Sequence, residues 1–288
     1  MAFGSLFKPK GSIVMQAPDH SLQGQQISLD IIVTPEEDLK PREVRVELLG
    51  EEIYYKTEYH TDSHGHRKLH TVKRDEPFDS IIHVLAEQPD LLKGTEQKWA
   101  CLLQLPADAP CTCRGKLVDI RWTLKSIVDV PNRADLSQEK SFMVLYQPQQ
   151  VSDSPSVPVE KSFGEVTLLL ATPIVAGSGS TIKGRLSLQM KEKLGIRSIR
   201  IELVQTEVAG TKTSEEVLAK VQVSGESTFT QYEAPSFDFS LDIPAQIPPT
   251  AVCTHSSLRW KVRAVLDRKM KTDFNVEQEI SIYNASRV

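Results

Sequence analysis

Apolar and polar residues alternate at every second position in many short stretches of the chain, including residues 44–48, 99–105, 199–203 and 258–266. A period of two is typical of a β-strand with one buried face and one wet face. Pro106 directly follows the run at residues 99–105, and Pro244 directly follows a further alternating run at residues 237–243. Proline stops a strand ladder because it has no N–H donor. The pattern predicts an all-β fold, with two tandem antiparallel β-sandwich domains and little or no helix. Residues 81–92 are ambiguous between a helix and a strand followed by a loop, since Pro89 interrupts them.

The chain also repeats itself. Trp122 and Trp260 are 138 residues apart, and neighbouring residues match at the same offset. These matched pairs are Pro106 and Pro244, Pro110 and Pro248, Arg121 and Arg259, Asp129 and Asp267, and Asp135 and Asp273. Earlier in each half the offset is 155, as between Arg42 and Arg197. Two similar halves are therefore predicted. The difference between the offsets gives the first half 17 extra residues between Glu47 and Trp99, a span that holds residues 54–74, and we expect them in a surface loop or lengthened hairpin.

The repeated tryptophans and aspartates have simple structural interpretations. Trp122 shares one strand face with Ile120 and Leu124, and Trp260 shares one with Leu258 and Val262. We therefore expect both indoles to fill a core rather than to stack on a ligand. The repeated carboxylates are expected to be turn residues, and they are Asp129, Asp135, Asp267 and Asp273.

The boundary between the halves is marked by composition. Residues 147–161 hold three prolines and few large apolar groups, which is typical of a partly stiffened linker. The predicted organisation is an N-terminal sandwich over residues 1–146, a linker over 147–162 and a C-terminal sandwich over 163–288.

Charge and hydropathy narrow the class of protein. The 288 residues include 34 Lys and Arg against 38 Asp and Glu, which gives a net charge of −4. That balance provides no field to attract nucleic acid or acidic lipid. No apolar run reaches signal-peptide length at the N-terminus, and none later reaches the roughly 18 residues that span a bilayer. We expect a soluble, cytoplasmic protein with no nucleic-acid partner and no direct membrane insertion.

Four cysteines are too few for a disulfide scaffold in a chain of this length. Cys111 and Cys113 lack the Cys-x-x-Cys spacing of zinc and thioredoxin-type sites. An ordinary turn with reduced thiols is therefore expected there.

Both halves contain a strand ending in Leu-Pro or Ile-Pro, a short proline-containing turn, and an aromatic strand that runs into an aspartate. In the first half the strand end and proline-containing turn are residues 105–110, and the aromatic strand is residues 120–129. The resemblance described next also rests on residues 44–52, on Gly94 leading to Trp99, and on Gly115. The pattern resembles the arrestin-like superfamily and covers almost the whole chain. It looks nearer to the α-arrestins, the arrestin-like subunit of retromer and the bacterial sporulation-control proteins than to the visual arrestins.

The resemblance implies immunoglobulin-like sandwiches and a non-catalytic scaffold or adaptor, a kind of protein often recruited to membrane proteins. The chain departs from the family in several respects. Its first strand, residues 12–16, lacks the adjacent lysines with which receptor-binding arrestins sense phosphate. It has no Pro-Pro-x-Tyr sequence and no long tail before Val288, and we identify no full equivalent of the arrestin polar core.

Four of the seven histidines fall within one short stretch, as His60, His64, His66 and His70. Imidazole suits zinc, nickel or copper, but this spacing dictates no coordination geometry. Histidine also changes charge between pH 5 and 8, which would suit a pH-dependent contact. The simpler alternative is a solvated hairpin with no ligand.

Catalytic signatures are missing. There is no Gly-x-Ser-x-Gly elbow, no His-Glu-x-x-His and no phosphate cradle, and Gly177-Ser-Gly179 is interpreted as a turn. We therefore predict no enzyme, no catalytic, cofactor-binding or metal residues and no cofactor, and we assign no binding residue.

Three function classes follow, in order of preference. The first is an arrestin-like scaffold or adaptor that offers strand edges, loop tips and sheet faces to other proteins, including cytoplasmic parts of membrane proteins, in trafficking or regulatory signalling. The second is a ligand-binding or metal-binding β-sandwich that uses the His60 to His70 hairpin. The third is a hydrolase, which would need a cleft lined by acid and base groups.

Overall fold

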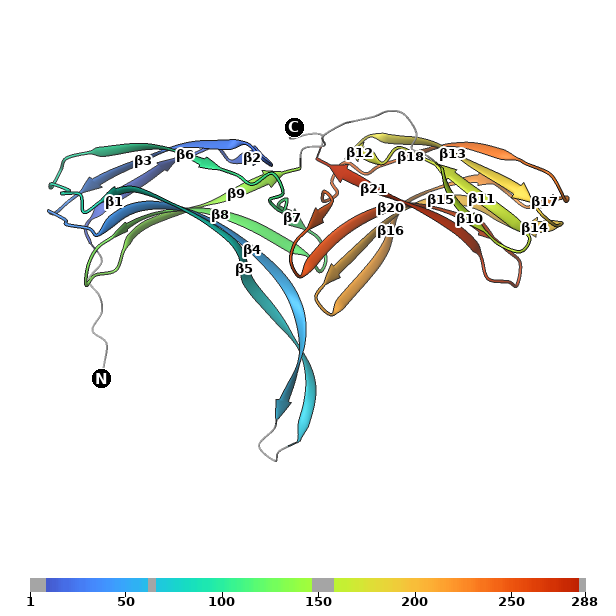
Figure 1. The fold of residues 1–288 in the computed structure, drawn as a ribbon, viewed down its shortest axis with the longest axis horizontal. Coiled ribbons are helices and arrows are strands. Elements are labelled where there is room, and N and C mark those ends of the chain that lie inside the picture. The colour runs from blue at the N-terminus through green and yellow to red at the C-terminus, as the bar shows by residue number, and fades with distance from the viewer. Residues whose placement is uncertain (1–8, 62–65, 147–157, 285–288) are drawn as a thin grey trace. The chain divides into compact units, whose positions relative to one another are not determined.

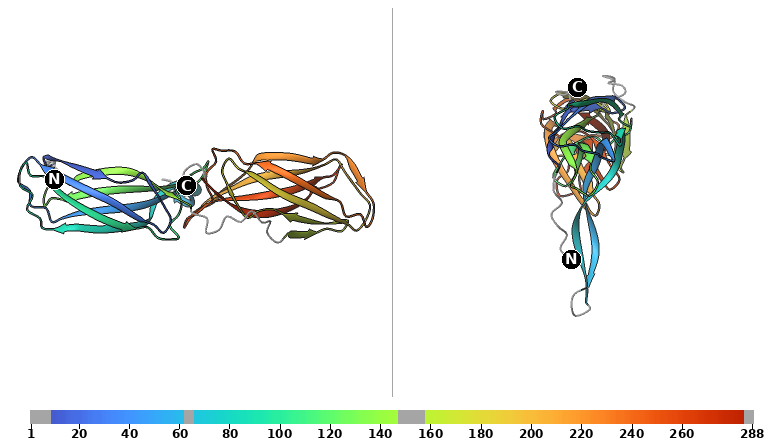
Figure 2. Two further views of the ribbon diagram at one scale, coloured as in Figure 1. Left: turned by 90° about the horizontal axis from the view of Figure 1, so that it is seen from above. Right: turned by 90° about the vertical axis from the view of Figure 1, so that its left-hand side faces the viewer.

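The computed structural model describes residues 9–61, 66–146 and 158–284, and it contains strands but no helix over those ranges. The chain forms two compact units. Unit 1 comprises Met1–Ile53, Lys73–Thr112 and Asp119–Leu145, and unit 2 comprises Tyr54–Val72, Cys113–Val118 and Tyr146–Val288. Figures 1 and 2 show the strands of each unit running alongside one another in layers. The all-β sandwich prediction is confirmed.

Two sheets enclose the core of unit 1. The smaller sheet has the order β1 (Gly11–Gln16), β3 (Gln26–Pro35) and β6 (Gln97–Gln104). The larger has the order β2 (His20–Leu22), β9 (Leu136–Leu145), β8 (Asp119–Asp129), β4 (Glu43–Thr61) and β5 (Arg67–Glu87). Alternating residues of β3, β4 and β8 point into the space between the sheets, so Ile31, Leu48 and Trp122 are all buried there.

Unit 2 repeats this plan with its own strands. One sheet has the order β10 (Val159–Ser162), β11 (Val166–Ala171), β13 (Thr181–Met190) and β18 (Ser236–Asp242). The other has the order β12 (Val175–Gly177), β21 (Phe274–Tyr283), β20 (Ser256–Asp267), β15 (Ser198–Ala209) and β16 (Lys212–Ser224). The shorter strands are β7 (Cys113–Arg114), β14 (Leu194–Ile196), β17 (Ser227–Phe229) and β19 (Ala251–Val252).

Strand register confirms that the two tryptophans occupy equivalent places. Trp122 lies opposite Phe142, and Trp260 lies opposite Ile280, which preserves the offset of 138. On the other side, Trp122 lies opposite Gly50 and Trp260 opposite Gln205, which preserves the offset of 155. Both indoles are almost fully buried, so their expected role in the core is confirmed.

The turn glycines repeat as well. Gly24 and Gly179 have φ angles of 74° and 77°, in the left-handed region that favours glycine. Their N–H groups donate to the carbonyls of the repeated prolines, Gly24 to Pro106 and Gly179 to Pro244. The interpretation of Gly177-Ser-Gly179 as a turn is therefore confirmed.

Two details differ from the simple antiparallel scheme. The short strands β2 and β12 pair in parallel with β9 and β21. β2 follows β1 and β12 follows β11 along the chain, and in each case the two consecutive strands lie in different sheets. The chain therefore crosses from one sheet to the other at these points. The ambiguous residues 81–92 are a strand followed by a loop, because β5 continues to Glu87 and Gln88 then adopts a φ of 45°.

Two segments from the first half of the sequence belong to unit 2. The buried Glu207 carboxylate accepts hydrogen bonds from the backbone N–H groups of Lys116, Leu117 and Val118, at 2.7–3.0 Å. A Cβ on Gly115 would collide with that carboxylate. Because a buried carboxylate needs such donors, Glu207 fixes the path of this segment.

The base of the β4 and β5 hairpin is held in a similar way. The carbonyl of Tyr55 accepts a hydrogen bond from Thr211 N at 2.9 Å, and Lys212 Nζ lies 3.8 Å from the centre of the Tyr55 ring. Gly210 has a φ of 60°, and a side chain there would collide with the Tyr55 carbonyl.

The expected linker, residues 147–162, lies partly outside the described residues, which do not include 147–157. Within its bounds, Val159–Ser162 forms strand β10.

Candidate protein-binding surfaces

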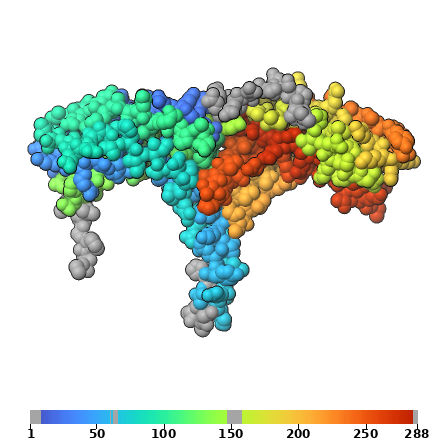
Figure 3. Space-filling model, viewed as in Figure 1, coloured from blue at the N-terminus to red at the C-terminus, as the bar shows by residue number. Residues whose placement is uncertain are grey.

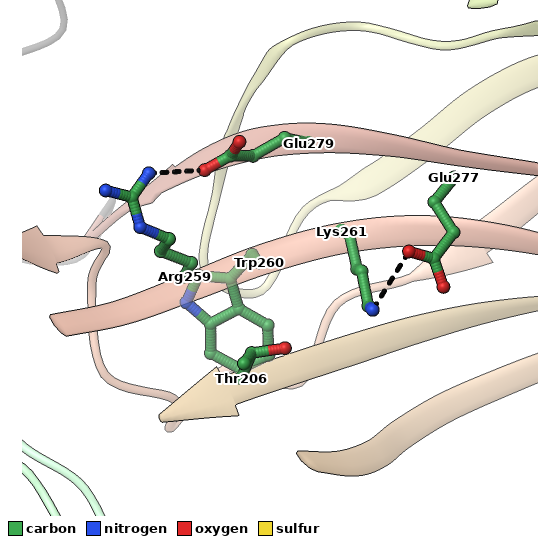
Figure 4. Close-up of a pocket in the computed structure, with 6 residues that line it drawn as sticks. All are labelled: Thr206, Arg259, Trp260, Lys261, Glu277 and Glu279. Carbon is green, nitrogen blue, oxygen red and sulfur yellow. Dashed lines mark hydrogen bonds and ion pairs between the residues drawn. The ribbon is translucent and has the colours of Figure 1, made fainter. Parts of the chain in front are cut away.

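A shallow hollow of about 300 Å³ lies on the outer face of the β12-β21-β20-β15-β16 sheet of unit 2 (Figure 4). Alternation along β20 places Arg259 and Lys261 on this face, while the buried Trp260 side chain belongs to the opposite face. The residues around the hollow are Thr206, Arg259, Trp260, Lys261, Glu277 and Glu279.

Ion pairs neutralise the charges of this hollow. Arg259 Nη1 lies 2.7 Å from a Glu279 oxygen, and Lys261 Nζ lies 3.0 Å from Glu277 and 2.9 Å from Glu215. Burial alone would lower the pKa of Lys261, but its hydrogen bonds to the two glutamates outweigh burial and raise that pKa. The hydrogen bond from Lys261 is the largest cause that lowers the pKa of Glu215. The basic side chains of this face are therefore already paired with carboxylates of the same sheet.

Among the described residues, the carboxylates, the arginines and the lysine with a shifted pKa all shift in favour of their charged forms. Among the carboxylates, Asp19, Glu37, Glu202, Glu215 and Asp238 all have a lowered pKa. The arginines and the lysine that shift have a raised pKa, as Lys261 does. In each case hydrogen bonds and nearby opposite charges outweigh burial and favour the charged form of the group.

Strand β5 is the outermost strand of its sheet in the order β2-β9-β8-β4-β5. A terminal strand presents N–H and C=O groups along one edge, which another chain can use for pairing. Its residues Phe78, Ile81 and Leu85 pack against the core of unit 1. On the other face, Ile82 is 58% exposed and Val84 is 41% exposed. β5 therefore combines an anchored inner face with an accessible apolar outer face.

Beyond the core the hairpin continues as a two-stranded ribbon (Figure 1). The pairing of β4 with β8 ends where Ile53 meets Asp119, whereas β4 itself extends to Thr61. The space-filling view shows this ribbon at the surface (Figure 3). Tyr59 is 69% exposed and Leu69 is 60% exposed. These two exposed apolar side chains make the ribbon a candidate for contact with another protein.

The unit 2 counterpart of β5 is more confined. β16 is the terminal strand of the sheet β12-β21-β20-β15-β16, but it also runs beside β18 of the facing sheet. It spans 13 residues, against 21 for β5. Val217 on β16 is 40% exposed, nearly the same as Val84 on β5.

The histidine cluster is only partly described. His66 and His70 are exposed, whereas His64 and the side chain of His60 lie outside the described residues. The residues that can be described contain no group of three or more His, Cys, Asp or Glu side chains arranged to hold a metal ion. The metal-binding alternative therefore remains an untested prediction.

The interpretation of Asp129 and Asp267 as turn residues is wrong. Both end a strand, and Arg42 donates to Asp129 as Arg197 donates to Asp267. Each aspartate also accepts a backbone hydrogen bond from that same arginine through its carbonyl oxygen. The sequence did contain the signal, because both members of the pair repeat at their own offset. In each unit this arginine–aspartate ion pair therefore lies at the end of the corresponding strand, β8 or β20.

The remaining repeated aspartates do lie outside strands. Asp273 accepts a hydrogen bond from Arg268 N at 3.1 Å across a turn and lies 3.5 Å from Arg200. Asp135 precedes β9. The turn interpretation therefore holds for this pair.

The cysteines are free thiols in the structure. Cys111 is buried, and burial raises its pKa to about 12, so it stays protonated at neutral pH. Cys113 lies in the two-residue strand β7, and its Sγ approaches the Pro249 carbonyl at 3.9 Å. The protonated, buried Cys111 thiol is therefore a poor nucleophile, since the thiolate is the reactive form.

Sequence reasoning missed the edge strand itself. The 17-residue difference between the repeat offsets placed extra chain between Glu47 and Trp99, where the β4 and β5 hairpin lies, but the alternation did not reveal that β5 is terminal. The buried Glu207 was also missed, although a glutamate within an alternating apolar run could have marked it.

Residues 15–150 match the family model described as Arrestin (or S-antigen), N-terminal domain. The match runs from within β1 to beyond the end of β9 and agrees with the resemblance found in the sequence. No curated protein matches the chain. The described part of the structure has no helix that is long and apolar enough to cross a membrane.

Proposed function

We propose that the protein is a non-catalytic adaptor that binds other proteins through its edge strand β5, on the ground that residues 15–150 match the arrestin N-terminal domain model. The family match is the observation that carries the proposal, because arrestin-like proteins generally act by binding proteins. The accessible edge of β5 supplies a physical means, since main-chain hydrogen bonds to an added strand require no special residue signature.

The setting of this activity is the cytoplasm, where the partner is a protein or the cytoplasmic part of a membrane protein. Trafficking and regulatory signalling are the processes that suit such an adaptor. The absence of strong net charge agrees with a protein partner rather than a nucleic acid.

The experiment is capture by proximity labelling in the native cell, followed by titration with each purified candidate. We expect saturable binding that the substitution Val84→Lys weakens by about tenfold, because it places a charge in the apolar contact. The matched control is Val217→Lys, at a nearly equally exposed valine on the unit 2 edge strand, and it should leave the affinity unchanged.

Two outcomes would contradict the proposal. If no captured protein binds saturably when purified, the adaptor function fails. If binding is saturable but both valine substitutions leave it unchanged, the function stands and β5 is not the binding edge.

A further inference from the structure

The first eight residues of β5 differ from the rest of the chain in charge. Residues 67–74 read Arg-Lys-Leu-His-Thr-Val-Lys-Arg and contain four cations and no carboxylate, in a chain whose net charge is −4. A local field of this sign on a negatively charged protein favours an acidic partner.

The cations are arranged around an uncharged centre. Alternation along a strand places Arg67, Leu69, Thr71 and Lys73 on one face. Arg67 and Lys73 are six residues apart, which corresponds to about 20 Å along a strand. All four of these side chains are exposed. This face therefore presents two positive ends with an exposed leucine and threonine between them.

The opposite face is less available. Lys68, His70 and Arg74 already interact with other groups of the chain, and Val72 is partly buried. The recognition argument therefore rests on Arg67 and Lys73, which lie on the more exposed face.

The hairpin is held in place from its β4 side. Tyr55 and Thr57 of β4 contact Thr211, through the Tyr55 carbonyl at 2.9 Å and through the two hydroxyl groups at 3.2 Å. β5 is terminal in the sheet order, so its outer edge is the side on which a further strand adds. An edge that is fixed before binding loses less entropy when a peptide pairs with it.

We propose that residues 67–74 of β5 bind an extended acidic peptide segment of the partner, which pairs as an added strand and places two carboxylates six residues apart opposite Arg67 and Lys73. This inference rests on the proposed adaptor function and names the chemistry of the partner. An extended peptide fits better than an anionic membrane, because only a strand also satisfies the backbone groups along the edge. The cations occupy both ends of the segment, so either strand direction brings carboxylates to them.

The probe is the synthetic peptide Glu-Thr-Val-Thr-Val-Thr-Glu, capped at both ends, titrated against the full chain by calorimetry. Its matched control is Val-Thr-Glu-Thr-Glu-Thr-Val, which has the same composition and charge but brings the carboxylates to the centre. We expect the first peptide to bind at least about tenfold more tightly, and we expect its affinity to fall with added salt, since the pairs are exposed. N-methylation of alternate amides should also abolish binding, because it removes strand donors.

Substitutions in the protein separate this edge from general charge. Lys73→Glu should weaken binding of the first peptide by about tenfold or more, whereas Lys220→Glu on the unit 2 edge strand β16 should not. Circular dichroism of both variants is the check that they remain folded.

Three results would overturn the inference. These are equal affinity for the two peptides, equal effects of the two lysine substitutions, and binding of phosphatidylserine vesicles without binding of either peptide. The captured partner would still bind saturably in these cases if the adaptor function is correct, so failure of the acidic-peptide site is distinguishable from failure of the function.

Discussion

The larger sheets of the two units share their pairing but differ at the terminal strand. β4, β8 and β9 of unit 1 correspond in register to β15, β20 and β21 of unit 2, down to the arginine and aspartate pair at one corner. β5 is 21 residues long and extends as a basic ribbon, whereas β16 has 13 residues and runs beside β18. Packing therefore constrains the inner strands of the two repeats to the same register, whereas the terminal strands can differ in length and charge.

A second difference lies inside the repeated core. Trp122 Nε1 donates to the Pro110 carbonyl at 2.8 Å, whereas Trp260 Nε1 has no hydrogen-bond partner among the described residues. Gly50 lies opposite Trp122, and Phe78 of β5 packs edge-on against that indole with ring centroids 5.2 Å apart. Opposite Trp260 the residue is Gln205. Both positions are therefore filled by a buried tryptophan, but only the Trp122 indole has a hydrogen-bond partner for its Nε1 among the described residues.

The largest expected effect tests the similarity of the two cores. Trp122→Ala and Trp260→Ala should each lower the free energy of unfolding by about 3–5 kcal/mol, because each removes a fully buried indole and leaves a cavity. Urea denaturation followed by circular dichroism measures both values. Tyr232→Ala, at a largely exposed tyrosine, provides a control that should change the free energy of unfolding little. A loss at only one of the two tryptophans would show that their positions are not equivalent in packing.

A smaller effect tests the difference between them. Trp122→Phe removes a hydrogen bond and leaves the Pro110 carbonyl without that donor, whereas Trp260→Phe removes an N–H that has no partner among the described residues. We expect Trp122→Phe to cost about 1 kcal/mol more in the free energy of unfolding. The same denaturation measurement decides this, and equal costs would contradict the assigned difference in bonding.

The smallest effect is a pH dependence in unit 2. Burial would raise the pKa of Glu202, but hydrogen bonds from Arg200 and Arg263 outweigh burial and lower it below its ordinary value of 4.5. A carboxylate with a lowered folded-state pKa stabilises the protein above its unfolded-state pKa, and this stabilisation is lost as pH falls through the folded-state value. Glu202→Gln should therefore flatten the loss of stability below about pH 4.5.

Thermal unfolding across pH 3 to 7 measures this slope. Glu226→Gln, at an exposed glutamate, is the matched control and should leave the slope as in the wild type. An unchanged slope in Glu202→Gln would contradict the stabilising role of its ion pairs.

Much of the fold could be predicted because packing imposes periodic patterns on the sequence. The alternation identified the strands, and the shared offsets located equivalent tryptophans, since both depend on a buried face. The edge position of β5 could not be predicted, because strand order depends on pairings between distant residues. The role of Asp129 was misjudged for the same reason, since its partner Arg42 is 87 residues away.

The most direct test of the central claim is hydrogen exchange of the full chain with and without the peptide Glu-Thr-Val-Thr-Val-Thr-Glu. Strand addition protects backbone amides along the receiving edge. We predict slower exchange in residues 67–74 of β5 and no change in β16. Unchanged exchange in β5 at saturating peptide, or equal protection of both edge strands, would contradict the claim that β5 is the protein-binding edge.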